Sequence, residues 1–234
     1  MKFNVITIFP DIITQYGATS ILGRAQKNKL ININSINLRD YTSDNHKTVD
    51  DTSYGGGAGM VMKAEPIFKA LKSINAIPFK KADGLTKLKT IFSKEIKRKK
   101  RTILLTPRGK QFDQKMAEKF SKLDEITFIC GRYEGVDQRV TEHMIDEEIS
   151  VGPYVIAGGE LSSLIVIEAV SRLVPGVLGN EDSLNEETFN DNILGGEYPQ
   201  YTKPDDFKGW KVPSVLLSGD HKKIKEWREE NNNK

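Results

Sequence analysis

Four short apolar runs of this chain each end in a turn that carries glycine, and these turns are the part of the sequence best suited to chemistry. They lie at residues 102–110, 126–136, 148–153 and 154–161. Apolar runs of this length predict buried strands, and loops that follow parallel strands gather at one edge of an α/β sheet, where ligands bind. Glycine lets backbone groups approach a ligand closely, because no Cβ stands in the way. The four turns therefore predict a nucleotide-type cofactor pocket built mainly from backbone.

This pocket matches neither of the two common nucleotide-binding fingerprints. No G-x-G-x-x-G follows a strand pattern, and G-x-x-x-x-G-K-[ST] does not occur in the chain. The glycine run at residues 54–61 comes closest, but its spacing fits neither fingerprint and no lysine closes it. Generic binding of a dinucleotide or a nucleoside triphosphate is therefore disfavoured.

Strand and helix patterns alternate along the chain, which predicts a parallel α/β sheet to position these turns. The expected strands lie at residues 1–9, 30–38 (with a slip near Ser35), 103–106, 126–130, 147–151 and 154–157. One expected helix starts at Asp11. The others span residues 65–75, 111–122, 137–144, 160–174 and 220–230. Residues 39–59 read as a long polar loop.

Composition restricts the class of protein. The chain has 234 residues, enough for one large domain or for one core plus a small lobe, and 38% of them are hydrophobic. No apolar run approaches transmembrane length and no signal peptide pattern occurs, so we expect a cytoplasmic protein with no membrane partner. Cys130 is the only cysteine, which excludes disulfides within the chain and cysteine-based zinc sites. It is expected to be a buried packing thiol.

The net charge of +3 is unevenly distributed. Residues 80–101 hold ten Lys/Arg and two Asp/Glu, a local charge of 10 − 2 = +8, so the remainder carries 3 − 8 = −5. A block of this kind could steer phosphate backbones. The alternative is a solvated insertion, and this is the interpretation that we favour.

Five strings of the sequence resemble the bacterial tRNA (guanine-N1)-methyltransferases, the TrmD family of knotted (SPOUT) methyltransferases. They lie at residues 54–63, 131–141, 151–162, 170–180 and 198–205, in the order of that family and with similar gaps. The similarity extends from Met1 to about Arg228. Any one string alone would be weak, whereas five in order are very specific.

The resemblance implies a fold and a reaction. The fold is a parallel sheet with helices on both faces and a deep trefoil knot, plus a small, mostly helical C-terminal domain. The implied division is 1–178 for the knotted cofactor-binding domain, 179–192 for a flexible linker with the catalytic base, and 193–234 for a tRNA-binding domain. The family is a homodimer with its active site at the subunit interface. It uses S-adenosylmethionine to methylate guanine N1 in tRNA immediately 3′ of the anticodon, preferentially after another guanosine.

The resemblance also assigns the cofactor contacts. They are Leu105, Thr106, Pro107, Gly109, Gly131, Tyr133, Glu134, Val151, Gly152, Ile156, Gly158 and Gly159, joined by Glu197 from the partner subunit. The apolar members could equally be plain core. Glu134 could bind the ribose hydroxyls or the methionine ammonium, or it could face water.

Two residues are the expected catalytic groups. Arg172 matches an arginine that polarises the guanine O6 atom; the alternative is an ion pair with Glu168 four residues earlier, worth roughly 0.3–0.5 kcal/mol. Glu187 stands where the family has an aspartate that takes the N1 proton. Glu186 and Asp182 could serve instead, and all three acids could be no more than a solvated linker.

The remaining expectations concern the substrate. His46, Asp50, Gly57 and Gly59 match a segment that contacts tRNA. Mg²⁺ dependence is implied by the resemblance alone, and the sequence indicates no metal ligand set. The C-terminal lobe is implied to hold the anticodon stem; the alternative is a solvated helix face with Trp210 and Trp227 as packing anchors. Two other functions compete, namely a knotted methyltransferase acting on another RNA and a catalytically inactive RNA-binding relative.

Overall fold

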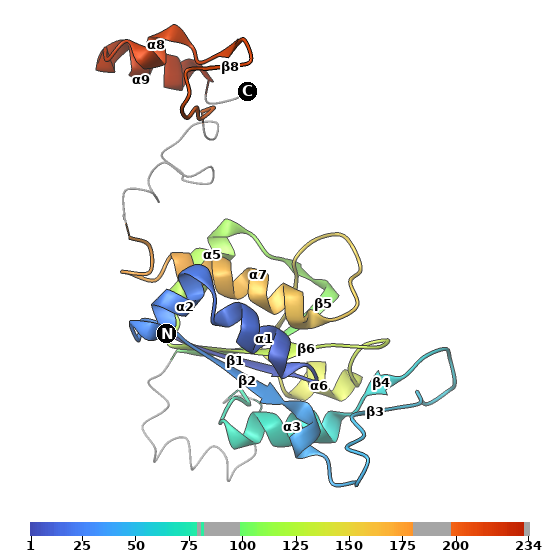
Figure 1. Cartoon of the computed structure of the whole chain (residues 1–234). Coiled ribbons are helices and arrows are strands. Elements are labelled where there is room, and N and C mark those ends of the chain that lie inside the picture. The colour runs from blue at the N-terminus through green and yellow to red at the C-terminus, as the bar shows by residue number, and fades with distance from the viewer. Residues whose placement is uncertain (79–80, 82–98, 180–197, 232–234) are drawn as a thin grey trace. The chain divides into compact units, whose positions relative to one another are not determined.

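The computed structural model describes residues 1–78, 81, 99–179 and 198–231, and Figure 1 shows the course of the chain. The chain divides into two compact units, Met1–Leu178 and Gly179–Lys234. The basic block at residues 80–101 falls mostly outside the described residues, as does all but the first residue of the expected linker at 179–192.

A five-stranded parallel sheet forms the centre of the first unit. Its order is β2-β1-β6-β5-β7, and its strands are β1 (Lys2–Thr7), β2 (Asn32–Asn37), β5 (Lys100–Gln111), β6 (Glu125–Cys130) and β7 (Glu147–Ser150). The predicted parallel α/β sheet is thereby confirmed. The slip expected near Ser35 is wrong, because β2 pairs with β1 residue by residue from Asn32 to Asn37.

Helices cover both faces of this sheet (Figure 1). One face carries α1 (Pro10–Gly17), α2 (Ser20–Lys27), α5 (Gln114–Ser121) and α7 (Gly159–Arg172), and the other carries α3 (Ala64–Ser73) and α6 (Gln138–His143). Because successive strand side chains point to opposite faces, β1 sends Phe3 and Val5 into the first apolar core and Ile6 into the second. The longest helix of the described chain, α7, has 14 residues, and none there is long and apolar enough to span a bilayer.

The strand expected at residues 154–157 does not form. These residues belong to a loop after β7, and Val155 is 83% exposed. In the described part of the chain β7 is the edge strand of the sheet, and Pro153, which follows it closely, cannot donate a ladder hydrogen bond. A short apolar run was therefore misread as a buried strand. The helix α2 and the short antiparallel pair β3 (Asp50–Asp51) and β4 (Val61–Met62) were not predicted at all.

Strand β5 is longer than expected, and its pairing with β7 is interrupted at the first glycine-bearing turn. Leu105 and Lys110 both pair with Ile149 of β7, so the four residues between them bulge out of the ladder. This excursion, residues 106–109, is the first of the predicted glycine-bearing turns. A bulge of this kind bends the strand and presents backbone groups at the sheet edge.

Cys130 ends β6 and is buried, as expected. Burial, with a smaller contribution from the nearby Glu160 carboxylate, raises the pKa of its thiol well above the ordinary value. Because the thiolate is the reactive form, we predict that the native protein does not react with Ellman's reagent at pH 8. The same protein in denaturant is expected to release one thiol equivalent per chain. Rapid labelling of the folded protein would contradict this burial.

The second unit is small and loosely packed. It contains β8 (Asp206–Phe207), β9 (Trp210–Lys211), α8 (Ser214–Leu217) and α9 (His221–Asn231), and none of residues 198–231 is fully buried. The expected terminal helix corresponds to α9, whereas the β8–β9 hairpin was not predicted. Trp227 packs edge-on against Tyr201, with ring centroids 6.3 Å apart.

Candidate functional site

A cavity of about 380 Å³ lies at the carboxyl ends of β5, β6 and β7. Its walls are the bulge of β5, the turn after β6, and the loop that joins β7 to α7. All of the described residues predicted to contact a cofactor line it, except Gly109. The four glycine-bearing turns, which are far apart in the sequence, therefore lie together around this cavity, as predicted.

Gly109 has a different position. A Cβ at this residue would overlap the backbone of Ile149 in β7, so Gly109 allows two stretches of main chain to pack closely instead of lining the cavity. The contact lies just beside the cavity, since Ile149 and Arg108 both line it.

Two consecutive glycines at the start of α7 permit close approaches that form the cavity floor. A Cβ on Gly159 would lie 2.7 Å from the Cα of Cys130, and a Cβ on Gly158 would overlap the guanidinium of Arg132. The amide of Gly159 donates to the carbonyl of Gly131 at 3.0 Å. The first turn of α7 is thus held directly against the end of β6.

A buried ion pair that the sequence did not predict lies under this floor. Arg132 donates to Glu160 through Nε at 3.0 Å and Nη2 at 2.9 Å, and Glu160 is 1% exposed. The other oxygen of Glu160 accepts from the hydroxyl of Thr7 at 2.7 Å, and the ring of Phe9 lies 4.6 Å from Arg132 Cζ. The pair joins β1, the turn after β6 and α7. Only the position of Arg132 between the glycines of the 131–135 turn could have drawn attention to it.

The glycine-rich loop at residues 54–62 is tied to the turn after β6. The amide of Glu134 donates to the carbonyl of Met60 at 3.0 Å, and the amide of Met62 donates to the carbonyl of Gly135 at 2.9 Å. Gly59 faces the side chain of Glu134, which lines the cavity. Of the expected substrate residues, Gly59 is therefore next to the cavity, and Asp50 is tied to the same loop by pairing with Met62.

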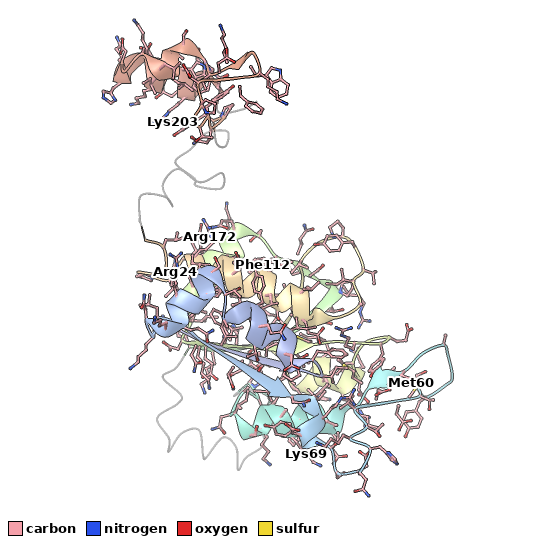
Figure 2. All side chains as sticks on the ribbon, viewed as in Figure 1. Arg24, Met60, Lys69, Phe112, Arg172 and Lys203 are labelled. Carbon is pink, nitrogen blue, oxygen red and sulfur yellow. The ribbon has the colours of Figure 1, made fainter. Side chains whose placement is uncertain are left out.

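The other two expected substrate residues lie less close. Gly57 is at the exposed part of the loop, which Figure 2 marks at Met60, and His46 is an exposed residue before β3. No contact in the described part of the chain joins either of them to the cavity lining.

Arg172 is far from the cavity within one chain. It is the last residue of α7, whereas the cavity is lined by the first turn of that helix. Fourteen helical residues rise by about 20 Å. Figure 2 shows Arg172 at the end of α7 that is remote from the loop at residues 151–158. Glu168, the alternative partner of Arg172, accepts a hydrogen bond from the hydroxyl of Tyr16.

The expected base Glu187 and the expected partner-subunit residue Glu197 lie outside the described residues, as do Glu186 and Asp182. Among the residues that are described, no three His, Cys, Asp or Glu side chains are grouped so as to hold a metal ion. His46, Asp50 and Asp51 accordingly do not form such a group.

Together, a parallel sheet and a glycine-lined cavity at its carboxyl edge define an α/β protein whose cavity lies where proteins of this architecture bind their ligands. The family described as "tRNA (Guanine-1)-methyltransferase TrmD" matches residues 1–234, and the chain belongs to this family.

Three curated relatives support the same assignment, and each is named tRNA (guanine-N(1)-)-methyltransferase. The protein of Carboxydothermus hydrogenoformans is 48% identical over 97% of this chain and 81% of its own length. The protein of Ruminiclostridium cellulolyticum is 46% identical, over 97% and 89%. That of Bacillus cereus strain B4264 is 45% identical, over 97% and 85%.

Proposed function

We propose that this protein transfers a methyl group from S-adenosylmethionine to N1 of the guanine immediately 3′ of the tRNA anticodon. The observation that carries the proposal is the cavity that the four glycine-bearing turns form in a chain of this family. A preference for a guanosine before the target base is proposed on the family resemblance alone. Because tRNA is a cytoplasmic molecule, the proposed place of action is the cytoplasm.

The cavity suits S-adenosylmethionine in size and chemistry. Its volume of about 380 Å³ falls within the range of small-molecule sites. Backbone amides and carbonyls of the turns can pair with the alternating donors and acceptors of an adenine edge. Leu105 and Ile156 supply apolar wall, and the carboxylate of Glu134 can accept from ribose hydroxyls or from the methionine ammonium.

The reaction needs two further groups from the chain. The bound cofactor supplies an electrophilic methyl group on a positively charged sulfur. We assign removal of the guanine N1 proton to the carboxylate of Glu187, which becomes protonated as the N1–methyl bond forms. Arg172 donates to the guanine O6 atom and stabilises the negative charge that develops there. The proton thus ends on Glu187, and the sulfur leaves as a neutral thioether.

Glu187→Gln is expected to lower the single-turnover rate of methyl transfer by roughly 100-fold or more, because the amide cannot accept the N1 proton. Affinity for S-adenosylmethionine should stay within twofold of wild type by calorimetry. Glu186→Gln measured in parallel distinguishes the two neighbouring acids. A full rate for Glu187→Gln, with loss in Glu186→Gln, would move the base to Glu186.

The active form is proposed to be a homodimer whose site combines two chains. The helix α7 separates the cavity from Arg172 by its whole length, which favours a site that takes the cavity from one chain and the arginine from the other. Large apolar side chains are also exposed on the adjoining surfaces of α1 and α7, namely Phe9, Ile12, Tyr16, Leu161 and Ile165. A patch of this kind is typical of a subunit interface. Glu197 is proposed to reach the cavity of the partner chain.

A deep trefoil knot in residues 1–178 is proposed from the family resemblance. The tight contact of Gly159 with the end of β6, next to the bulge of β5, is consistent with a chain threaded at this point. Mg²⁺ dependence rests on the resemblance only. Residues 193–234 are proposed to hold the tRNA, with residues 179–192 as the linker that carries Glu187.

The proposal is tested with two tRNA transcripts that differ in the nucleotide 3′ of the anticodon, guanosine in one and adenosine in the other. Labelled methyl from S-adenosylmethionine should enter only the first, at guanine N1. Transfer to ribosomal RNA but to neither transcript would favour a related enzyme with another RNA substrate. Cofactor binding without transfer to any RNA would indicate an inactive relative.

A further inference from the structure

The β8–β9 hairpin presents a pair of aromatic rings to solvent. Phe207 and Trp210 are cross-strand partners, and their ring centroids are 5.8 Å apart. Trp210 is 72% exposed and Phe207 is 53% exposed. Lys208 lies between them in the turn, with its Nζ 5.6 Å from the centroid of the Phe207 ring. Two exposed rings beside a cation form a surface on which a nucleobase can stack.

The cations of the C-terminal unit fall into two groups. On α9, Lys222, Lys223 and Lys225 pair with Glu226, Asp220 and Glu229 at 3.9, 3.3 and 4.0 Å, so much of the charge of this helix is balanced locally. Within residues 198–231, no carboxylate lies within 4.0 Å of the ammonium of Lys208 or Lys211 in the hairpin. Among residues 198–231, Lys208 and Lys211 of the hairpin therefore remain for a phosphate, together with Lys203 outside it.

The backbone conformation of the hairpin turn is one that lysine seldom adopts. Lys208 has φ +56° and Gly209 has φ +86°, which is the pattern of a type I′ turn. Asparagine, aspartate and glycine are the residues that adopt this conformation readily, and lysine is disfavoured there. The amide of Gly209 donates to Asp206 at 2.8 Å and helps to hold the turn. A lysine at this unfavourable position is understandable if its ammonium binds a partner of the protein.

We propose that this hairpin, and not the helix α9, is the main RNA contact of the C-terminal unit. The Trp210 ring stacks on an unpaired base, the Phe207 ring, inclined at 59° to it, contacts the edge of that base, and Lys208 binds the adjacent phosphate. The other aromatic residues among 198–231 already have partners within the unit, because Trp227 packs on Tyr201 and the Arg228 guanidinium lies 4.5 Å from the Tyr198 ring. The inference rests on the proposed function, since it assigns the RNA contact of that same reaction.

The test uses the two tryptophans of the chain, Trp210 and Trp227. In the full-length Trp227→Phe variant, Trp210 is the only indole fluorophore. Titration with an anticodon stem-loop transcript is expected to quench its emission. Trp210→Ala, followed by filter binding of whole tRNA, is expected to weaken affinity roughly tenfold, as loss of one stacked base does.

Lys208→Asn separates the RNA contact from the stability of the turn. Asparagine suits a type I′ turn better than lysine, so the melting temperature should be unchanged or higher. Affinity for tRNA should nevertheless fall several-fold, with a salt dependence reduced by about one released counterion. Lys225→Gln removes one exposed charge from α9 and is the control, expected to change affinity less than twofold.

Three results would overturn the inference. They are RNA saturation without quenching of Trp210, tRNA affinity of Trp210→Ala within twofold of wild type, and Trp210 emission already shielded from acrylamide before RNA is added. The last would mean that protein covers the hairpin. If methyl transfer by the wild type is normal, these results reject the hairpin contact alone. A wild-type chain that neither binds nor methylates tRNA rejects the proposed function as well.

Discussion

An equimolar mixture of Ile156→Trp and Arg172→Ala chains, each inactive alone, is expected to regain roughly a quarter of wild-type methyl transfer after subunit exchange. Ile156 lines the cavity, so a tryptophan there should fill the space that the cofactor needs. Arg172 lies at the other end of α7. If one site takes its cavity from one chain and its arginine from the other, each mixed dimer contains one intact site.

The arithmetic follows from random pairing in a symmetric dimer. About half of the dimers are mixed, and each has one intact site of two, which gives the expected quarter. Mixed dimers purified through two different affinity tags should reach about half of the wild-type activity. Calorimetry must find no cofactor binding by Ile156→Trp and normal binding by Arg172→Ala.

Failure of the mixture to recover, with both single variants inactive, would mean that the cavity and the arginine act within one chain. Full activity of Arg172→Ala alone would mean instead that Arg172 is not catalytic. Arg172→Lys tests whether the planar guanidinium is needed. Lysine keeps the charge but loses the planar pair of donors. A dimeric enzyme in which Arg172→Lys and Arg172→Ala both methylate at the wild-type rate would remove Arg172 from the mechanism.

Replacement of Arg132 by methionine is expected to destabilise the first unit by about 3 kcal/mol, because it leaves a buried carboxylate without its cation. Glu160 is 1% exposed. Of the hydrogen bonds to its carboxylate given above, only the one from the hydroxyl of Thr7 remains after the substitution. Urea unfolding followed by far-UV circular dichroism measures the loss. Cofactor affinity should fall as well, since Arg132 lines the cavity and supports its floor.

The matched control is the double variant Arg132→Met/Glu160→Gln. It removes the unpaired charge together with its cation, so it should recover part of the stability lost in Arg132→Met. Glu160→Gln alone leaves the guanidinium, which is 21% exposed and can reach water, so its effect should be smaller. Equal losses in Arg132→Met and in the double variant would show that the ion pair does not account for the destabilisation.

Much of the site could be predicted from the sequence because its parts are local. Three of the four glycine-bearing turns belong to their own apolar strands, and parallel pairing alone brings β5, β6 and β7 together at these turns. The same reasoning failed at residues 154–157, where the apolar run forms an exposed loop instead of a strand. It also misplaced Gly109, whose requirement for glycine comes from the backbone of β7.

The sequence by itself determined the class of fold, the turns that line the cavity and the family, because local patterning and five ordered motifs carry that information. The contact of Arg132 with Glu160 across 28 residues, and the contact of Gly59 with Glu134, depend on tertiary structure. The separation of Arg172 from the cavity is different, because it follows in part from the helix predicted at residues 160–174: the rise of an α-helix keeps the two ends about 20 Å apart. Only the tertiary structure decided that the first turn of this helix lies at the cavity, because Gly159 packs directly against Cys130 at the end of β6.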